Sequence, residues 1–382
     1  MAPTRVLWVL PMIAALLFVV STGATAQAAA GPNAELWVPT QGAVFTMTNS
    51  PTGNAILAYE IGPQGSLIPA GTFATHGLGT GVSLADSGSV ALSSDHRSLF
   101  VVDAGSNAVS VFHVNPIGGG VPLLTFTERV SSHGVLPVSI AVSGQFVYVL
   151  NAGTSVTPGN IFGFFLGDHG LLLPLPGSSR PLSTSASTAP AQIGFTPTGN
   201  ALVVSEKNTS VLDSYVVDTQ GYASGPTVTA SNGATPYGFA FGRGGSLIVS
   251  DAAASALTSY HVAASGALTV KTPALSDGQA AACWVATVDG GQYAFAANAH
   301  NNTISTYGVG PRGGLTLLVP VAETTGAADT DMAVGGSQAQ FLLVYDAGAG
   351  EIQDFQIGPG ASLSPQYAVF GLPATAEGLA AF

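Results

Sequence analysis

Glu206 and Lys207 place a carboxylate next to an amine at the end of the run Val203-Val204-Ser205. A carboxylate at the end of a strand can act as the general base that activates water for hydrolysis. Such a reaction also needs a hydrogen-bond donor for the oxyanion that develops on the substrate. His133 and His300 are the candidate catalytic partners of Glu206 for such a reaction, although no local motif fixes them beside it. A solvated ion pair explains the same Glu-Lys dipeptide without catalysis.

Glu206 belongs to a set of acids and amides that each close a short apolar run, and these residues are candidates for ligand binding. Together with two cationic residues, the predicted ligand-binding set is Asp103, Asn151, Lys207, Asp251, Asn298, Asp346 and Arg180. An Asp or Asn at a strand end can instead bond the backbone of the turn that it begins, a structural role needed once in every repeat. Both interpretations stay open at this point.

The sequence predicts no cofactor and no metal centre. Its seven histidines are scattered, without the paired spacing of a zinc site, and no haem, nucleophile-elbow or phosphate-loop motif occurs. Asp329 and Asp331 offer an alternative, because calcium takes oxygen ligands and a further carboxylate could complete such a site. An Asp-x-Asp pair in a polar loop is the simpler interpretation.

The apolar runs with a terminal acid or amide recur seven times, at intervals of 45 to 55 residues. They end at Asn49, Asp103, Asn151, Glu206, Asp251, Asn298 and Asp346. In five of the seven repeats an aromatic residue follows nine positions later, and in two it follows at ten or thirteen. In six of the seven repeats a glycine lies six positions beyond the aromatic. A constant register across so many intervals indicates a repeat architecture.

Each repeat has the pattern of four short strands, one of them ending at the acid or amide and the next alternating in polarity. Seven such units of about 50 residues predict an all-β fold, a seven-bladed β-propeller with four antiparallel strands per blade. Residues 377–382 resemble an innermost strand that no repeat follows, so we expect the C-terminal strand to complete the N-terminal blade. A parallel β-helix is the alternative, but its rungs are shorter than these repeats.

The N-terminus has the pattern of an export signal. A basic start, a 15-residue apolar run and the spacing Ala24-x-Ala26 predict a signal peptide at 1–26, a lead-in segment at 27–42 and the propeller at 43–382. An uncleaved membrane anchor is the alternative, although 15 residues fall short of the roughly 20 that span a bilayer. We therefore expect a secreted or periplasmic protein without stable membrane insertion after cleavage.

Composition excludes several classes of partner and of fold. Eight Lys and Arg against 20 Asp and Glu leave no basic surface for nucleic acid. A single cysteine, Cys283, excludes a disulfide framework, and the apolar run around it predicts a buried side chain. The partners left are a small molecule, a carbohydrate or a protein bound at the channel face, where the loops at the strand ends gather around the central channel.

The strand-end residues, read as variants of Tyr-Val-x-Asn such as Tyr148-Val149-Leu150-Asn151, resemble those of the lactonase-type propellers. That family includes bacterial 6-phosphogluconolactonases and fungal carboxymuconate cyclases, and it shades into YVTN-repeat surface proteins. The resemblance covers about residues 43–382 and implies a seven-bladed propeller. In family members with enzyme activity, it implies a His after a Pro entering an inner strand, an Arg-His pair in a following blade and a strand-terminal Glu.

This sequence departs from that pattern at three of the four positions. Val138 stands in place of the His, Ala191 and Gln192 stand in place of the Arg-His pair, and only Glu206 matches the carboxylate. We therefore favour a secreted, non-catalytic module that binds a ligand or protein through its channel face. The alternative is a lactone-acting enzyme, a lactonase or muconate-cyclase-like protein, that uses Glu206 as its base.

Overall fold

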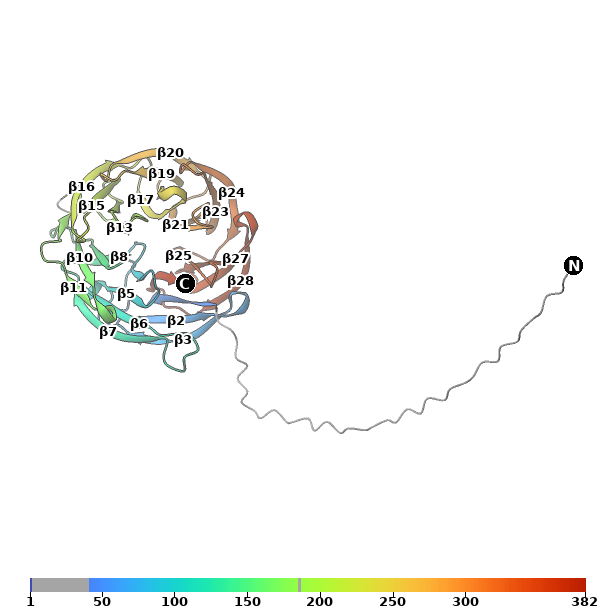
Figure 1. Cartoon of the computed structure of the whole chain (residues 1–382), viewed down its shortest axis with the longest axis horizontal. Coiled ribbons are helices and arrows are strands. Elements are labelled where there is room, and N and C mark those ends of the chain that lie inside the picture. Colours follow the sequence, from blue (N-terminus) through green and yellow to red (C-terminus); the bar gives the residue numbers. More distant parts are fainter. Residues whose placement is uncertain (2–40, 185–186) are drawn as a thin grey trace, which may run out of the picture. The chain divides into compact units, whose positions relative to one another are not determined.

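Seven antiparallel sheets follow one another around a ring in the computed structural model, which describes Met1 and residues 41–184 and 187–382 (Figure 1). The predicted signal at 1–26 and residues 27–40 of the predicted lead-in lie outside the described residues. We number the sheets blades 1 to 7 in chain order. Each has four strands in sequence from the centre of the ring outwards, and blade 3 carries one further two-residue strand. The predicted seven-bladed propeller is confirmed.

The strands occupy four positions that repeat from blade to blade. The innermost strands, from blade 1 to blade 7, are β29 (Glu377–Ala381), β4 (Val90–Leu92), β8 (Pro137–Ser143), β13 (Pro190–Phe195), β17 (Pro236–Phe241), β21 (Ala282–Val288) and β25 (Asp329–Gly335). The second strands are β1 (Gly42–Met47), β5 (Ser98–Asp103), β9 (Phe146–Asn151), β14 (Ala201–Glu206), β18 (Leu247–Asp251), β22 (Tyr293–Asn298) and β26 (Phe341–Asp346). The third strands are β2 (Ala55–Ile61), β6 (Ala108–Val114), β10 (Asn160–Leu166), β15 (Val211–Val217), β19 (Ala256–Val262), β23 (Thr303–Val309) and β27 (Glu351–Ile357). The outermost strands are β3 (Leu67–Ala74), β7 (Leu124–Ser131), β11 (Leu172–Pro174) with β12 (Arg180–Pro181), β16 (Ala223–Ala230), β20 (Leu268–Ser276), β24 (Leu315–Thr324) and β28 (Leu363–Phe370).

The C-terminal strand closes the ring, as the sequence predicted. Strand β29 pairs antiparallel with β1, with Val44 opposite Ala381 and Phe45 opposite Ala380. Blade 1 is thus assembled from both ends of the described propeller, and its innermost strand is the last of the chain. Closure of this kind removes the open sheet edge that would otherwise pair with another chain.

The two ends of the ring differ in what they carry. Because neighbouring strands are antiparallel, the second strands end, and the third begin, at one end of the ring, which we call the anchor end. The links from each outermost strand to the next blade lie at this end as well. The turns between first and second strands and between third and fourth strands lie at the opposite end.

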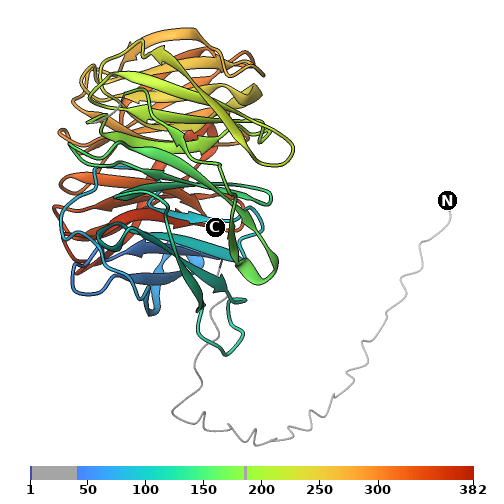
Figure 2. The ribbon, with the colours of Figure 1, turned by 90° about the vertical axis from the view of Figure 1, so that its left-hand side faces the viewer.

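The hydrophobic core lies between neighbouring blades, where the sheets pack face to face (Figure 2). One cluster joins Val44 and Tyr59 of blade 1 to Phe341 and Leu343 of blade 7. The aromatic residues predicted at the third strands are all buried: Tyr59, Phe112, Phe164, Tyr215, Tyr260, Tyr307 and Phe355. Burying one such side chain contributes roughly 1.5–3 kcal/mol. Faces buried on both sides explain why only 7% of the residues are charged.

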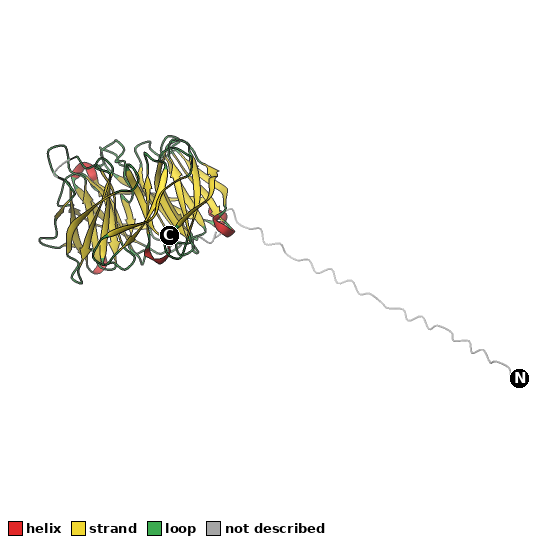
Figure 3. Ribbon diagram, turned by 90° about the horizontal axis from the view of Figure 1, so that it is seen from above, coloured by secondary structure: helices red, strands yellow, loops and turns green. Residues whose placement is uncertain are grey.

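Short turns complete the blades, and the described helices are single 3₁₀ turns (Figure 3). They are η1 (Pro63–Gly65), η2 (Ala104–Ser106), η3 (Asp168–Gly170), η4 (Arg243–Gly245) and η5 (Pro359–Ala361). The glycines predicted between third and outermost strands have positive φ angles, for example +87° at Gly221 and +84° at Gly266. This backbone region favours glycine, which explains their fixed place in the repeats.

Candidate functional site

Six of the predicted strand-end residues occupy the last position of a second strand, and all six are fully buried: Asp103, Asn151, Glu206, Asp251, Asn298 and Asp346. Their side chains bond within the blade. Asp251 accepts hydrogen bonds from Thr258 on the third strand (2.5 Å) and from Ser231 of the link that leaves the previous blade (3.1 Å). These bonds join three segments at the anchor end, which is the structural role considered for an Asp or Asn at a strand end.

Asp103 and Asn298 are held in the same manner as Asp251. Asp103 accepts a bond of 2.6 Å from Ser110, and Asn298 donates one of 2.9 Å to Ser305. In each case the hydroxyl lies seven positions after the strand-end residue. Asn151 donates to the carbonyl oxygen of Ser132 (3.1 Å), and the carboxylate of Asp346 accepts from the backbone of Gly326 (3.1 Å).

Glu206, the predicted base, lies in the interior of blade 4. Its carboxylate accepts hydrogen bonds from the backbone N–H of Ser183 (3.0 Å), from the Ser183 hydroxyl (2.5 Å) and from the Thr209 hydroxyl (2.5 Å). Asp213 on β15 lies beside it, and burial together with Glu206 raises the pKa of Asp213 to about 8. Glu206 thus has three donors and an acidic neighbour, all from its own blade or the link to it.

The predicted partners of Glu206 do not gather around it. His133 is exposed, and its ring stacks on Phe162 of blade 3 with 4.0 Å between centroids. His300 is exposed on the link between β22 and β23 of blade 6. Arg180 donates to the carbonyl oxygens of Gly177 (2.8 Å) and Ser179 (2.7 Å).

Residues 75–89, which we call the strap, link β3 of blade 1 to β4 of blade 2 and cross the centre of the ring at the anchor end. A segment bonded to blades on opposite sides of a ring must pass over its middle. The bonds run from Leu84 N to Glu377 Oε1 of blade 1 (3.0 Å), from Ser139 Oγ of blade 3 to Ser87 O (2.7 Å), from Ser87 N to Ala191 O of blade 4 (3.0 Å) and from Trp284 Nε1 of blade 6 to Asp86 O (3.0 Å).

Lys207 contributes to the same arrangement from blade 4. Its ammonium group donates a hydrogen bond to the carbonyl oxygen of Ala85 in the strap and lies over the Tyr237 ring of blade 5, 4.8 Å from the centroid. The Tyr237 ring in turn meets Trp284 edge to face, with 5.2 Å between centroids. Of the predicted ligand-binding residues, Asp103 accepts a hydrogen bond from Thr75 where the strap begins (2.6 Å), and Lys207 bonds the strap at Ala85, at the channel mouth.

Three buried carboxyl groups lie at the channel mouth. Asp86 of the strap itself and Asp331 and Glu377 of the innermost strands are 2%, 3% and 2% exposed. Burial raises the pKa of Asp331 and of Glu377 to about 7. Burial, with the charges of Glu377 and Asp331, raises the pKa of Asp86 well above its ordinary value. Burial lowers the pKa of Lys207 to about 8, although the charge of Asp86 opposes this. The channel mouth is therefore a buried cluster that is partly protonated near neutral pH.

The positions where the lactonase-type pattern has its His and Arg-His residues are packed into the structure. Val138 and Ala191 are 1% and 0% exposed. Gln192 bridges blades 4 and 5, donating to the carbonyl oxygen of Phe239 (3.0 Å) and accepting from its N–H (2.7 Å). These side chains hold blades together and offer no acid or base.

Among the described residues, no group of three or more His, Cys, Asp or Glu side chains is arranged to hold a metal ion. Asp331 instead accepts backbone N–H groups from Met332 (2.8 Å) and Leu379 (2.9 Å). No helix in the described ranges is both long and apolar enough to span a membrane. Cys283 is buried, as its apolar surroundings predicted.

The arrangement of the blades matches that of several solved structures. The periplasmic gluconolactonase PpgL of Pseudomonas aeruginosa superposes with a TM-score of 0.71 at 16% identity, over 89% of this chain and 98% of that one. The chain has a lactonase-like propeller fold. A candidate 6-phosphogluconolactonase from Bacteroides fragilis gives 0.68 at 17% identity over 90% and 98%, and a Lactobacillus plantarum protein gives 0.71 at 17% over 90% and 100%. No protein-family model and no curated protein sequence matches the chain.

Within this lactonase-like fold, sequence reasoning missed Tyr237, Trp284 and Glu377 as residues of the channel mouth. In the sequence, Trp284 and Tyr237 have the pattern of ordinary strand residues, because each lies in an apolar run. The common signal is position: each lies within the first three residues of an innermost strand, at the anchor end.

Proposed function

We propose that this chain is an extracytoplasmic, non-catalytic propeller that binds a ligand or partner protein through its channel face. One observation carries the proposal: the polar groups at the channel mouth fasten the strap, as Lys207 does at Ala85 and Glu377 at Leu84. A substrate would have to displace the strap to meet these groups. The replacement of the family's His and Arg-His by Val138, Ala191 and Gln192 supports the same conclusion.

The outer surface of the channel face is suited to a macromolecular partner. The strap presents Leu78 (41% exposed) and Val82 (66%), and a loop of blade 3 at the same end of the ring presents Val156 (86%). Exposed apolar side chains near polar loops are common at protein interaction sites. With more acidic than basic residues in the chain, a neutral or cationic partner fits this face better than an anionic one.

Turnover of a panel of unphosphorylated lactones by the chain without residues 1–26 tests the catalytic part of the proposal. We expect hydrolysis at the uncatalysed rate. A rate well above background that E206Q abolishes would overturn the proposal in favour of the lactone-acting enzyme. A gluconolactonase of the same fold serves as the positive control for the assay.

Binding is tested by affinity capture, from the extracellular or periplasmic fraction of the source organism, with the wild-type chain and with a V82D/V156D variant. We expect the wild type to retain a specific partner and the double variant to lose it, because two charges would be buried at the interface. A partner retained equally by V82D/V156D would contradict binding through the channel face. Circular dichroism and urea unfolding of the variant check that its fold is intact.

A further inference from the structure

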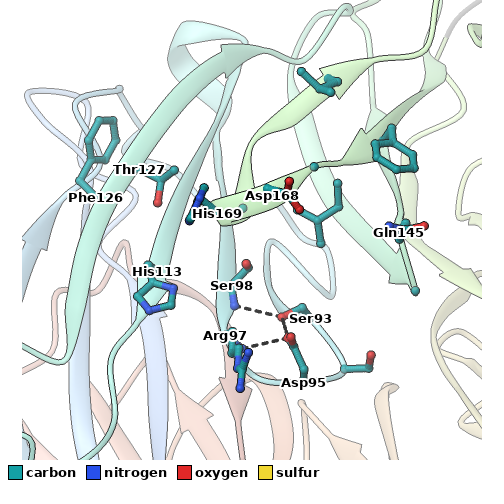
Figure 4. A pocket seen from close by; sticks show the side chains of 17 residues that line it. Ser93, Asp95, Arg97, Ser98, His113, Phe126, Thr127, Gln145, Asp168 and His169 are labelled. Atoms are coloured by element: carbon teal, nitrogen blue, oxygen red, sulfur yellow. Dashed lines mark hydrogen bonds between the residues drawn. The ribbon is translucent and has the colours of Figure 1, made fainter.

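A cleft of about 1040 Å³ lies at the opposite end of the ring from the strap, between blades 2 and 3 (Figure 4). Its walls come from the turn at 93–98 and strand β7 of blade 2 and from residues 144–145 and 165–170 of blade 3. Strand β11 begins at this end of the ring, where it pairs with residues 164–166 of β10, and its Leu173 lines the cleft.

The blade 2 wall includes the turn at 93–98, whose backbone is fixed by hydrogen bonds and which carries the cationic side chain of Arg97. Ser93 Oγ donates to Asp95 Oδ1 (2.6 Å), and the backbone N–H groups of Arg97 and Ser98 donate to Asp95 Oδ1 (3.1 Å) and Ser93 Oγ (3.0 Å). These bonds set the backbone in position without using the guanidinium group of Arg97. Within the described residues, that group makes no hydrogen bond.

Further polar side chains line the cleft without hydrogen bonds to the rest of the described chain. They are His113 on β6, Thr127 on β7, Gln145 in the turn after β8, and Asp168 and His169 in η3 (Figure 4). Together with Arg97 they form a mixed set of donors and acceptors. Hydroxyl groups, which donate and accept at once, satisfy such a mixture better than ligands that only accept.

Two phenylalanines line the edges of the cleft, one from each blade, and the Phe126 ring also meets His76 edge to face, with 4.6 Å between ring centroids. Phe126 of β7 is 36% exposed, and Phe165 of β10 is half-buried. The negative face of an aromatic ring attracts the C–H groups on one face of a sugar ring. Alternation of aromatic surface with unbonded polar side chains is the chemistry that recognises a saccharide.

The charges of the cleft favour a neutral ligand. Asp95 and Asp168 offset Arg97, and the other ionisable side chains are histidines. A phosphorylated or sulfated ligand would need several Arg or Lys side chains, and only one lines this cleft. A neutral polyhydroxyl compound needs none.

Two smaller hollows continue the cleft around the ring. One of about 610 Å³ shares Asp95, Arg97 and His113 with it and reaches Phe382, and one of about 310 Å³ shares Gly144 and Gln145 and reaches blade 4. We propose that this cleft binds a neutral oligosaccharide: a chain of sugar rings would lie along the hollows, with one ring at the central cleft beside Phe126, Arg97 and His169. The site lies at the opposite end of the ring from the channel mouth, and its contact with the strap is that of Phe126 with His76, where the strap begins.

His169 allows a variant that cannot fail by misfolding. Its φ angle is +60°, a conformation that costs energy for histidine and little for glycine. H169G therefore keeps or improves stability while removing the imidazole from the cleft. His133 is a matched control, because it is exposed, has φ of +55° and lies at the anchor end.

The experiment is an array of neutral and acidic oligosaccharides probed with the chain without residues 1–26, followed by calorimetric titration of the best neutral glycan. We expect H169G and R97A to weaken binding at least about tenfold, the loss of one or two hydrogen bonds, and H133G to leave it unchanged. The proposal would be overturned if no glycan bound, or if H169G and R97A bound the glycan as tightly as the wild type. A preference for acidic glycans would overturn it as well. So would binding of a peptide library in the same cleft with no glycan bound. V82D/V156D should keep its glycan affinity, which separates this test from that of the channel face.

Discussion

The ammonium nitrogen of Lys207 lies 4.8 Å from the centroid of the Tyr237 ring and donates to the carbonyl oxygen of Ala85. One side chain thus joins blade 4, blade 5 and the strap. Lys207 is also the cation that interacts with the carboxyl groups of Asp86 in the strap and Glu377 in blade 1. A single amine therefore holds the strap in place and partly neutralises the acids of the channel mouth.

Replacing Lys207 by methionine should loosen the strap. K207M keeps the apolar stem, loses the bond to Ala85 and leaves the carboxyl groups without their cation, which we expect to cost about 1–3 kcal/mol. Hydrogen exchange of the Ser87 amide, bonded to Ala191, should accelerate. The control is K271M, a change of the same chemistry at an exposed position on β20. Unchanged Ser87 protection in K207M would show that the other bonds of the strap hold it alone.

The pH dependence of stability should be inverted relative to that of many proteins. An acid with a raised folded-state pKa binds more protons when folded, so the free energy of unfolding falls as pH rises through the interval between the two pKa values. Asp331 and Glu377 titrate at about 7 and Asp213 and Asp354 at about 8 in the folded chain, all raised by burial. Lys207, lowered to about 8, acts oppositely above that pH, because the unfolded chain then binds more protons.

Urea midpoints between about pH 5 and pH 8 test this, and we expect them to fall as pH rises. E377Q should make the decline shallower, because glutamine keeps an oxygen for the Leu84 N–H and does not titrate. A midpoint that rises across this range, or a slope identical in E377Q, would contradict the assignment of raised pKa values to the carboxyl groups at the channel mouth.

The bond between Asp251 and Thr258 should be worth more than an exposed hydrogen bond. T258V removes a donor and leaves one oxygen of a fully buried carboxylate without it, at an expected cost of about 1–3 kcal/mol. T227V, at an exposed position of β16, is the matched control and should change stability by less than about 0.5 kcal/mol. Equal effects of the two substitutions would show that the strand-end carboxylate is not a structural clamp.

The fold could be predicted from the sequence because the sequence pattern repeats in every blade. Spacing placed Asp103, Glu206 and Asp251 at the ends of second strands, and the structure has them there. The sequence contains a further regularity that the prediction did not use. Ser110, Thr258 and Ser305 each lie seven positions after the strand-end residue that they bond. That spacing indicates a structural role for the strand-end residues of these three blades, since the same hydroxyl partner recurs at the same place in each of them.

The channel mouth and the cleft could not be predicted from the sequence, because both depend on contacts between blades. Lys207 meets Ala85 across 122 positions of sequence, and Trp284 meets Asp86 across 198. The strap has no periodicity that would show its course over the ring. The cleft is lined by residues 93–98 of blade 2 and 165–170 of blade 3, two turns that no sequence pattern brings together.

Pairing of β29 with β1 should be essential for cooperative folding. The covalent link between blade 7 and β29 should not be essential. Deleting residues 377–382 removes the innermost strand of blade 1, exposes the edge of β1 and takes away the Leu379 N–H that Asp331 accepts. We expect that chain to lose its cooperative urea transition and to aggregate through the open edge.

A circular permutant provides the decisive comparison. Phe382 exchanges backbone hydrogen bonds with Ala43 at 3.0 and 3.1 Å, so a short glycine-rich linker can join Phe382 to Gln41 as a hairpin. A chain opened between Pro373 and Ala374 and joined in this way carries the same strands in the same places. It should recover a cooperative transition with a midpoint near that of the parent. A permutant that unfolds like the deletion, or a deletion that unfolds like the parent, would show that β29 does not close the ring as its pairing with β1 implies.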